Sequence, residues 1–362
     1  MDEMSKGPST KITAEVQPRV RVSTLTPWLW AVGALVVMIV LSAAIGPVAI
    51  PPLVVVKMLL SRLPTLNINV DWPSMFDTIL YQIRLPQTAL IALTGMALGG
   101  SGAAYQGLFR NPLADPYIIG VASGAGLGAV LAMSAHWPTT LLGMVTIPAA
   151  AFIGALITVA VVYFLARVGR STPITTLILS GVAVSAFTSA LTSLLMLLST
   201  DQLHRAITWL LGGFSLGGWE PVLAMLPYLG IGMGALFVLG RPLNVLQFGD
   251  DQATQLGLNV ERLKTVVIVT SSLVAATAVS FSGIIGFVGL VVPHLARLLW
   301  GPDYRRLIPL ATIFGGAVLL AADIVARTIL SPRELPVGVV TAVLGAPFFL
   351  WLLRRAKNVR FW

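Results

Sequence analysis

The chain alternates between ten long apolar stretches and short polar connections. A helix that crosses the roughly 30 Å hydrocarbon layer of a bilayer needs about 20 apolar residues, and each stretch is close to that length. Lipid offers no partners for backbone N–H and C=O groups, so each stretch must close its hydrogen bonds within a helix. The ten predicted spans are residues 28–48, 85–108, 118–135, 141–166, 174–198, 222–239, 265–280, 284–299, 307–330 and 337–353.

Residues 265–299 fit either one kinked span or two short spans joined at residues 280–283. The basic residues decide between these readings, because Lys and Arg gather on the cytoplasmic side of membrane proteins. With the N-terminus inside and ten crossings, 17 of the 23 lysines and arginines lie on the inner side. A single crossing would move Arg305, Arg306 and the basic C-terminal residues outside. We therefore expect ten crossings and two cytoplasmic termini.

Composition supports an all-α polytopic membrane protein. Hydrophobic residues make up 56% of the chain and charged residues 10%, whereas soluble domains carry about 25% charged residues. In such a protein the net charge of +9 reflects loop orientation and does not indicate a nucleic-acid partner. Because the chain has no cysteine, disulfides, thiolate metal sites and cysteine nucleophiles are excluded.

We expect a single transmembrane domain at residues 28–353, between a polar cytoplasmic leader at 1–27 and a basic cytoplasmic tail at 354–362. A cleaved signal peptide is the weaker interpretation of the first apolar run, which is long for one.

Two polar stretches have patterns of their own. Residues 201–218, on the outer side, predict a short amphipathic helix that ends on glycines. Residues 241–264, on the inner side, predict two short helices at an angle. Pro242 would open the first, Asp250 and Asp251 suit a helix N-terminus, and Gly257 suits a stop. This inner element could present a surface to a soluble partner.

Four motifs in this order resemble one known family. They are Arg110-Asn-Pro-Leu-Ala-Asp-Pro, Gly286-Phe-Val-Gly-Leu-Val-Val-Pro-His-Leu-Ala-Arg297, Ala322-Asp-Ile-Val-Ala-Arg327 and Glu334-Leu-Pro-Val-Gly-Val-Val-Thr-Ala-Val-Leu-Gly-Ala-Pro347. They are similar to the permease subunit of bacterial ABC importers for iron–siderophore complexes, haem and vitamin B12. The resemblance covers about residues 81–353.

The resemblance implies a type II ABC importer permease with ten helices in the bacterial cytoplasmic membrane. It also implies a homodimer with the substrate path at its interface, two partner ATPase subunits that bind ATP and Mg²⁺, and an extracytoplasmic binding protein. The chain itself contains no Gly-x-x-x-x-Gly-Lys-[Ser/Thr] loop, so nucleotide chemistry would belong to the partner. No covalent chemistry, catalytic residue, metal or cofactor is expected of this subunit. The glycine cluster at residues 120–128 lies in an apolar helix and predicts close helix packing.

The resemblance also assigns residues to roles. ATPase coupling falls within residues 241–264, on Phe248, Gly249, Asp250, Asp251, Ala253, Leu256 and Gly257. The path and its cytoplasmic gate fall on Ser171, Thr172, Thr175, Ser180, Thr188 and Thr192. Docking of the binding protein falls on Arg84 and Arg327. Arg333 or Arg205 would replace the basic residue that the vitamin B12 permease has where Gln87 stands.

Several of these residues admit a structural reading. Arg84 and Arg327 could be helix-end arginines that reach the headgroups, and Asp323 could pair with Arg327 four residues later. The hydroxyls of residues 174–198 could bond between helices instead of lining a path. For His294 we expect a hydrogen-bonded structural role and not a haem or metal ligand. The residues of the structural motifs are Asn111, Pro112, Asp115, Pro116, Pro293, His294, Arg297 and Asp323.

Two other function classes fit the hydropathy pattern. An ion-coupled secondary transporter should bury carboxylates or broken helices at the membrane midplane, and Asp323 alone is thin support for that. A membrane-embedded enzyme should carry a cluster such as His-Glu-x-x-His, which the sequence lacks. Among cargoes, iron–siderophore complexes and haem are placed slightly ahead of vitamin B12.

Overall fold

The computed structural model describes residues 25–356, except 47, 66–68, 136, 138–139, 142–143, 214–216 and 332. The expected leader up to residue 24 and the tail from residue 357 lie outside the described residues. The helices are α1 (Thr26–Ala44), α2 (Pro52–Ser61), α3 (Ser74–Thr78), the π-helical turn η1 (Ile79–Arg84), α4 (Leu85–Phe109), α5 (Val121–Ser134), α6 (Thr146–Ala166), α7 (Ile174–Leu198), the 3₁₀ turn η2 (Thr200–Gln202), α8 (Leu203–Leu210), α9 (Glu220–Leu246), α10 (Asp250–Gln255), α11 (Val260–Ser282), α12 (Val288–Trp300), α13 (Tyr304–Thr328) and α14 (Val337–Ala356).

A helix stands at each of the ten predicted spans. Within the described chain, seven helices are long and apolar enough to cross a membrane: α1, α3–α4 taken together through η1, α6, α7, α9, α11 and α13. At the other three predicted spans, α5, α12 and α14 are shorter apolar helices. The all-α multi-pass class is therefore confirmed, whereas the number of crossings stays a prediction. A pair of two-residue strands, β1 (Thr140–Leu141) and β2 (Met144–Val145), is antiparallel.

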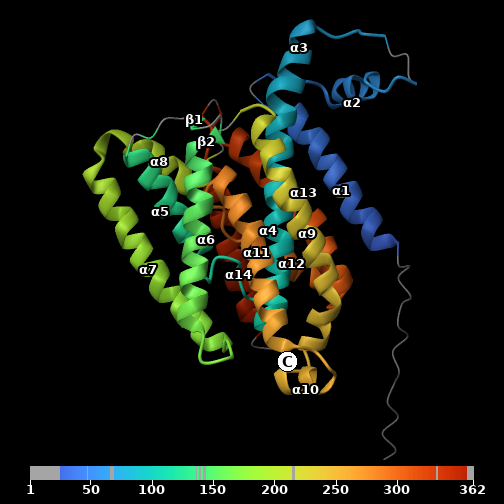
Figure 1. Cartoon of the computed structure of the whole chain (residues 1–362). Helices are drawn as coiled ribbons and strands as arrows, with labels where there is room; N and C mark the ends of the chain where they lie inside the picture. Colours follow the sequence, from blue (N-terminus) through green and yellow to red (C-terminus); the bar gives the residue numbers. More distant parts are fainter. Residues whose placement is uncertain are drawn as a thin grey trace, which may run out of the picture.

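Helix α4 is the centre of the bundle. Most of its residues are buried, and it packs on α9, α11, α12 and α13 (Figure 1). Its contact with α13 depends on small residues: a Cβ on Gly95 would lie 2.3 Å from the carbonyl oxygen of Gly315, and a Cβ on Gly99 would lie 2.3 Å from that of Ala311. No real Cβ tolerates such a distance, so only glycine allows these two helices to approach so closely.

The glycine cluster at residues 120–128 has the predicted packing role. A Cβ on Gly124 would lie 2.6 Å from the carbonyl oxygen of Gly154, and a Cβ on Gly128 would lie 2.1 Å from that of Ala150. Helices α5 and α6 therefore approach each other through these glycines, as small residues allow in membrane bundles.

Residues 265–299 form two helices and not one. Helix α11 ends at Ser282, Gly283 has a positive φ of 74°, and Phe287 at the start of α12 has a φ of 68°. Left-handed backbone at both positions stops a continuous helix. The break near residues 280–283 is thus confirmed, whereas the two separate crossings that the basic residues favour stay a prediction.

The two ends of the bundle differ. Helices α2, α3 and α8 and the β1–β2 pair lie at one end, and α10 lies at the opposite end (Figure 1). The predicted amphipathic helix at residues 201–218 is confirmed as α8, which is followed by Gly212 at a φ of 78°. These ends are called the α8 end and the α10 end below.

The expectation of two short helices within residues 241–264 is wrong. Helix α9 continues through Arg241 and Pro242 to Leu246, and α11 already begins at Val260, so α10 is the single separate helix. The extension persists because Leu243 and Leu246 are buried and because Asn244 Nδ2 donates to Asp303 Oδ1 at 2.6 Å. Tertiary burial therefore outweighs the helix-breaking tendency of the proline.

Candidate functional site

Helix α10 is a short, firmly bounded element with an exposed apolar side chain on either side of it in the sequence. Gly249 precedes it with a φ of 103°, and Gly257 follows it with a φ of 86°, conformations that glycine adopts without strain. Asp250 and Asp251 occupy its first turn, where a carboxylate favours the helix N-terminus.

The α10 surface combines exposure with a fixed backbone. Phe248 is 65% exposed and Leu256 is 68% exposed, while Ala253 between them is buried. Two large apolar side chains held outside a rigid turn are typical of an interaction surface, because a hydrophobic anchor that enters a partner's pocket contributes most of an interface's energy. We call Phe248, Asp251, Gln252, Gln255 and Leu256 the α10 surface.

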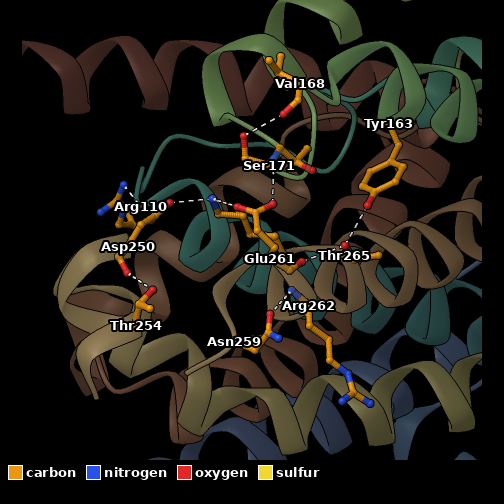
Figure 2. A network of polar contacts seen from close by, with 12 residues as sticks. Arg110, Tyr163, Val168, Ser171, Asp250, Thr254, Asn259, Glu261, Arg262 and Thr265 are labelled. Carbon is orange, nitrogen blue, oxygen red and sulfur yellow. Dashed lines mark hydrogen bonds and ion pairs between the residues drawn. The ribbon is translucent and has the colours of Figure 1, made fainter. Parts of the chain in front are cut away.

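A polar network fastens α10 to the rest of the α10 end (Figure 2). Asp250 Oδ2 is 2.7 Å from Lys264 Nζ, and Asp250 Oδ1 is 3.5 Å from Arg110 Nη2. Lys264 Nζ is also 3.0 Å from Glu261 Oε1, one turn away on α11. Gln247 Nε2, just before α10, donates to the carbonyl oxygen of Gly107 on α4 at 2.9 Å. The helix is therefore held from both α4 and α11.

The loop between α6 and α7 belongs to the same network. Val168 and Ser171 pair through two backbone hydrogen bonds, 3.0 and 3.1 Å long, so the loop closes on itself. The backbone N–H of Thr172 donates to Glu261 Oε2 at 2.8 Å, and Tyr163 shares a 3.0 Å hydrogen bond with Thr265. The structure thus brings the predicted gate residues Ser171 and Thr172 next to the predicted coupling segment (Figure 2).

The Asn-Pro-Leu-Ala-Asp-Pro turn after α4 has the structural role expected of it. Asn111 Oδ1 accepts from the N–H of Leu113 at 2.9 Å, and Asp115 Oδ1 accepts from the N–H of Tyr117 at 2.8 Å. Both are Asx turns, in which the side chain replaces a backbone turn partner. Desolvation raises the pKa of Asp115 to about 6. Pro112 and Pro116 stand beside these two residues and restrict the turn further.

The motif that contains Pro293, His294 and Arg297 ties α12 to its neighbours. Arg297 Nη2 donates to Gln106 Oε1 on α4 at 3.0 Å and to Tyr304 Oη on α13 at 3.3 Å. The hydrogen-bonded role expected of His294 is wrong, because neither of its ring nitrogens has a partner among the described residues.

The hydroxyls of α7 point in two directions. Thr188 and Thr192 are buried, and they donate to the carbonyl oxygens of Val184 and Thr188 in their own helix. Ser189 and Ser193, each one residue further along the helix, are exposed. Ser180 is half-buried and Thr175 is exposed. A path along the exposed face of α7 would therefore contact Ser189 and Ser193 before Thr188 and Thr192.

Arg84 and Arg327, the predicted docking cations, are buried at 5% and 8% exposure. Arg84 Nη1 donates to the carbonyl oxygens of Ala43 and Ala44, both at 2.8 Å, at the C-terminus of α1. Arg327 Nη1 donates to the carbonyl oxygen of Ile45 at 3.1 Å. Both guanidinium groups satisfy carbonyls that a helix end leaves without intrahelical partners.

Arg327 also forms the intrahelical ion pair considered for it. Its Nη2 is 2.5 Å from Asp323 Oδ2, and both side chains are nearly inaccessible. Arg205, on α8, and Arg333, between α13 and α14, are the other two predicted docking residues, and both are exposed. Direct docking by Arg84 or Arg327 stays a prediction, and it would require α1 to release them.

Two members of the network were missed by sequence reasoning. Neither Lys264 nor Glu261 was assigned a role from the sequence, yet they join α10 to the α6–α7 loop. Their spacing of three residues at the start of an apolar helix was the available signal, since such pairs share a helix face.

The chain is similar to known transport proteins over most of its length. A model of the FecCD transport family matches residues 34–355. The cobalamin import system permease protein BtuC of Halobacterium salinarum is 41% identical, with 90% of this chain and 95% of that protein covered. The hemin transport system permease protein HmuU of Yersinia pestis is 40% identical, with 77% of this chain and 84% of that protein covered.

A solved structure has the same architecture. It is described as a metal-chelate type ABC transporter in an inward-facing conformation, with a TM-score of 0.77 and 30% sequence identity. The match covers 92% of this chain and 99% of that chain. The helical bundle, the four motifs and the matched family model agree, and the chain therefore belongs to the FecCD transport family of ABC transporter permeases.

Proposed function

We propose that this chain is the permease subunit of an ATP-driven importer for a metal chelate: an iron–siderophore complex, haem or cobalamin. Two copies form the translocation path at their interface, and each copy crosses the cytoplasmic membrane ten times with both termini inside. A separate ATPase binds at the α10 end, and an extracytoplasmic binding protein delivers the cargo at the α8 end. The related cobalamin and hemin permeases support this class of cargo.

The α10 surface is the observation that carries this proposal. Phe248 and Leu256 are exposed apolar anchors on a backbone that Asp250, Lys264 and Ala253 fix in place. A surface that transmits a displacement of the partner to the membrane helices has to bind the partner and keep a fixed backbone. The α10 surface has exposed apolar anchors on a fixed backbone. When the partner ATPase closes on ATP, it would displace α10, and α10 would displace α4 and α11, to which it is attached.

Cargo selection is assigned to the binding protein. On α7 the exposed polar side chains are hydroxyls such as Ser189 and Ser193, among apolar residues such as Val182 and Phe187. Such a surface offers weak hydrogen bonds and no charge, and so it would let a large chelate pass without holding it. The docking protein, which binds the cargo first, would then set specificity.

Uptake into proteoliposomes tests the proposal. We expect a radiolabelled iron–siderophore complex, haem or cobalamin to accumulate only when the ATPase, the binding protein and luminal ATP are all present. A non-hydrolysable ATP analogue should give no accumulation. Uptake driven by a proton or sodium gradient without the ATPase would contradict the proposal and favour a secondary transporter.

A further inference from the structure

Lys264, on α11, is a buried cation that pairs with two carboxylates, Asp250 of α10 and Glu261 of its own helix. Its side chain is 5% exposed, with Asp250 Oδ2 at 2.7 Å and Glu261 Oε1 at 3.0 Å. Burial of an ammonium group is costly unless it is paired and hydrogen-bonded, so the two acids account for its presence there. Because Asp250 belongs to α10, whereas Lys264 and Glu261 belong to α11, the pair of Lys264 with Asp250 joins the two helices.

The bridge continues in both directions through alternating partners. The second oxygen of Glu261, Oε2, accepts the N–H of Thr172 at 2.8 Å. The second oxygen of Asp250, Oδ1, is 3.5 Å from Arg110 Nη2. We call Arg110, Asp250, Lys264, Glu261 and Thr172 the Lys264 chain; it runs from the end of α4, through α10 and α11, to the loop before α7 (Figure 2).

The far end of the Lys264 chain is attached to backbone and not to a side chain. Glu261 binds the peptide N–H of Thr172, which is separated from the first residue of α7, Ile174, by Pro173 alone. Proline fixes its own φ, and the α6–α7 loop is closed by the Val168–Ser171 pair, so little slack remains between Thr172 and α7. A shift of Glu261 is therefore a shift of the N-terminus of α7.

We propose that Lys264 is a positioning residue that transmits displacement of α10 to α7, and thereby to the path. This inference rests on the proposed function, since it specifies how the α10 surface acts on the membrane helices. Three successive contacts of 2.7, 3.0 and 2.8 Å connect Asp250 to Thr172. Helix α7 is the element at the far end, and it carries the predicted path residues Ser180, Thr188 and Thr192.

Cargo transported per ATP hydrolysed, measured in the reconstituted complex, tests the chain. Lys264→Met should lower this ratio at least about tenfold, within the usual range of coupling between linked sites. Lys264→Arg keeps a cation between Asp250 and Glu261 and should restore much of the ratio. Arg306→Met, which removes an exposed cation at the start of α13 and outside residues 241–264, is the control and should leave the ratio unchanged.

Glu261 provides a second test that does not depend on how Lys264→Met folds. Glu261→Gln retains an oxygen that can accept the Thr172 N–H, whereas Glu261→Ala removes it, so alanine should lower the ratio more than glutamine does. A merely structural role would change protein yield and thermal stability and leave the ratio intact. An unchanged ratio in Glu261→Ala, or in an assembled Lys264→Met complex, overturns the inference. A wild-type complex without ATP-driven uptake would instead refute the proposed function, and the inference with it.

Discussion

Replacement of Arg327 with methionine is expected to lower the free energy of unfolding by about 3–5 kcal/mol, because it leaves a buried carboxylate without its partner. Asp323 is 1% exposed, and its Oδ2 is 2.5 Å from Arg327 Nη2. The same guanidinium donates to Ser42 Oγ at 2.9 Å and to the carbonyl oxygen of Ile45, so the substitution also frees the C-terminus of α1. Unfolding in detergent, followed against increasing SDS, measures the loss.

Two comparisons make this result specific. Arg333→Met removes an exposed arginine between α13 and α14 and should change stability by no more than about 0.5 kcal/mol. Asp323→Leu combined with Arg327→Met should cost less than the sum of the single changes, because the two residues interact directly. If Arg327→Met and Arg333→Met changed the free energy of unfolding by equally small amounts, the ion pair would have no structural role. Docking would then be the one role left for Arg327.

Replacement of both Phe248 and Leu256 with aspartate is expected to weaken binding of the partner ATPase at least about a hundredfold. Truncation of an apolar anchor at an interface costs roughly 2 kcal/mol or more, and each 1.4 kcal/mol is tenfold in affinity. Both side chains are largely exposed in the isolated subunit, so its folding should not suffer. Retention of the co-expressed ATPase on the purified permease measures the effect.

The matched control for this double change lies at the opposite end of the bundle. Leu203 and Ile207 are also exposed apolar residues, one turn apart on α8. Their replacement by aspartate adds the same charge and should leave ATPase binding intact. Loss of the ATPase in the α8 variant, or its retention in the α10 variant, would place the ATPase surface elsewhere.

The positions of the helices could be predicted from the sequence because they follow local rules. The length of the apolar stretches predicted a helix at every span. The basic connections predicted the break near Gly283, and the amphipathic pattern that ends on glycines predicted α8. The prediction was wrong at Pro242, where a local rule for helix starts competes with burial of Leu243 and Leu246 against the core. Burial is a property of the whole bundle, and the local pattern does not contain it.

The contacts within the site were harder to predict for a related reason. Thr172 and Glu261 are 89 residues apart in the chain and meet through a backbone N–H, which carries no sequence signature. The partners of Arg84 are likewise carbonyl oxygens, about 40 residues upstream at the end of α1. A sequence shows that a charge is present, but only the packing of the helices shows which backbone group satisfies it.

Single-cysteine accessibility tests most directly the claim that α10 and α8 face opposite sides of the membrane. The chain contains no cysteine, so each introduced thiol is the only one. With a membrane-impermeant maleimide, Arg205→Cys should be labelled in intact spheroplasts, and Leu256→Cys only in inverted vesicles. Labelling of both positions from the same side would contradict the account, since the ATPase and the binding protein could not then occupy the two ends.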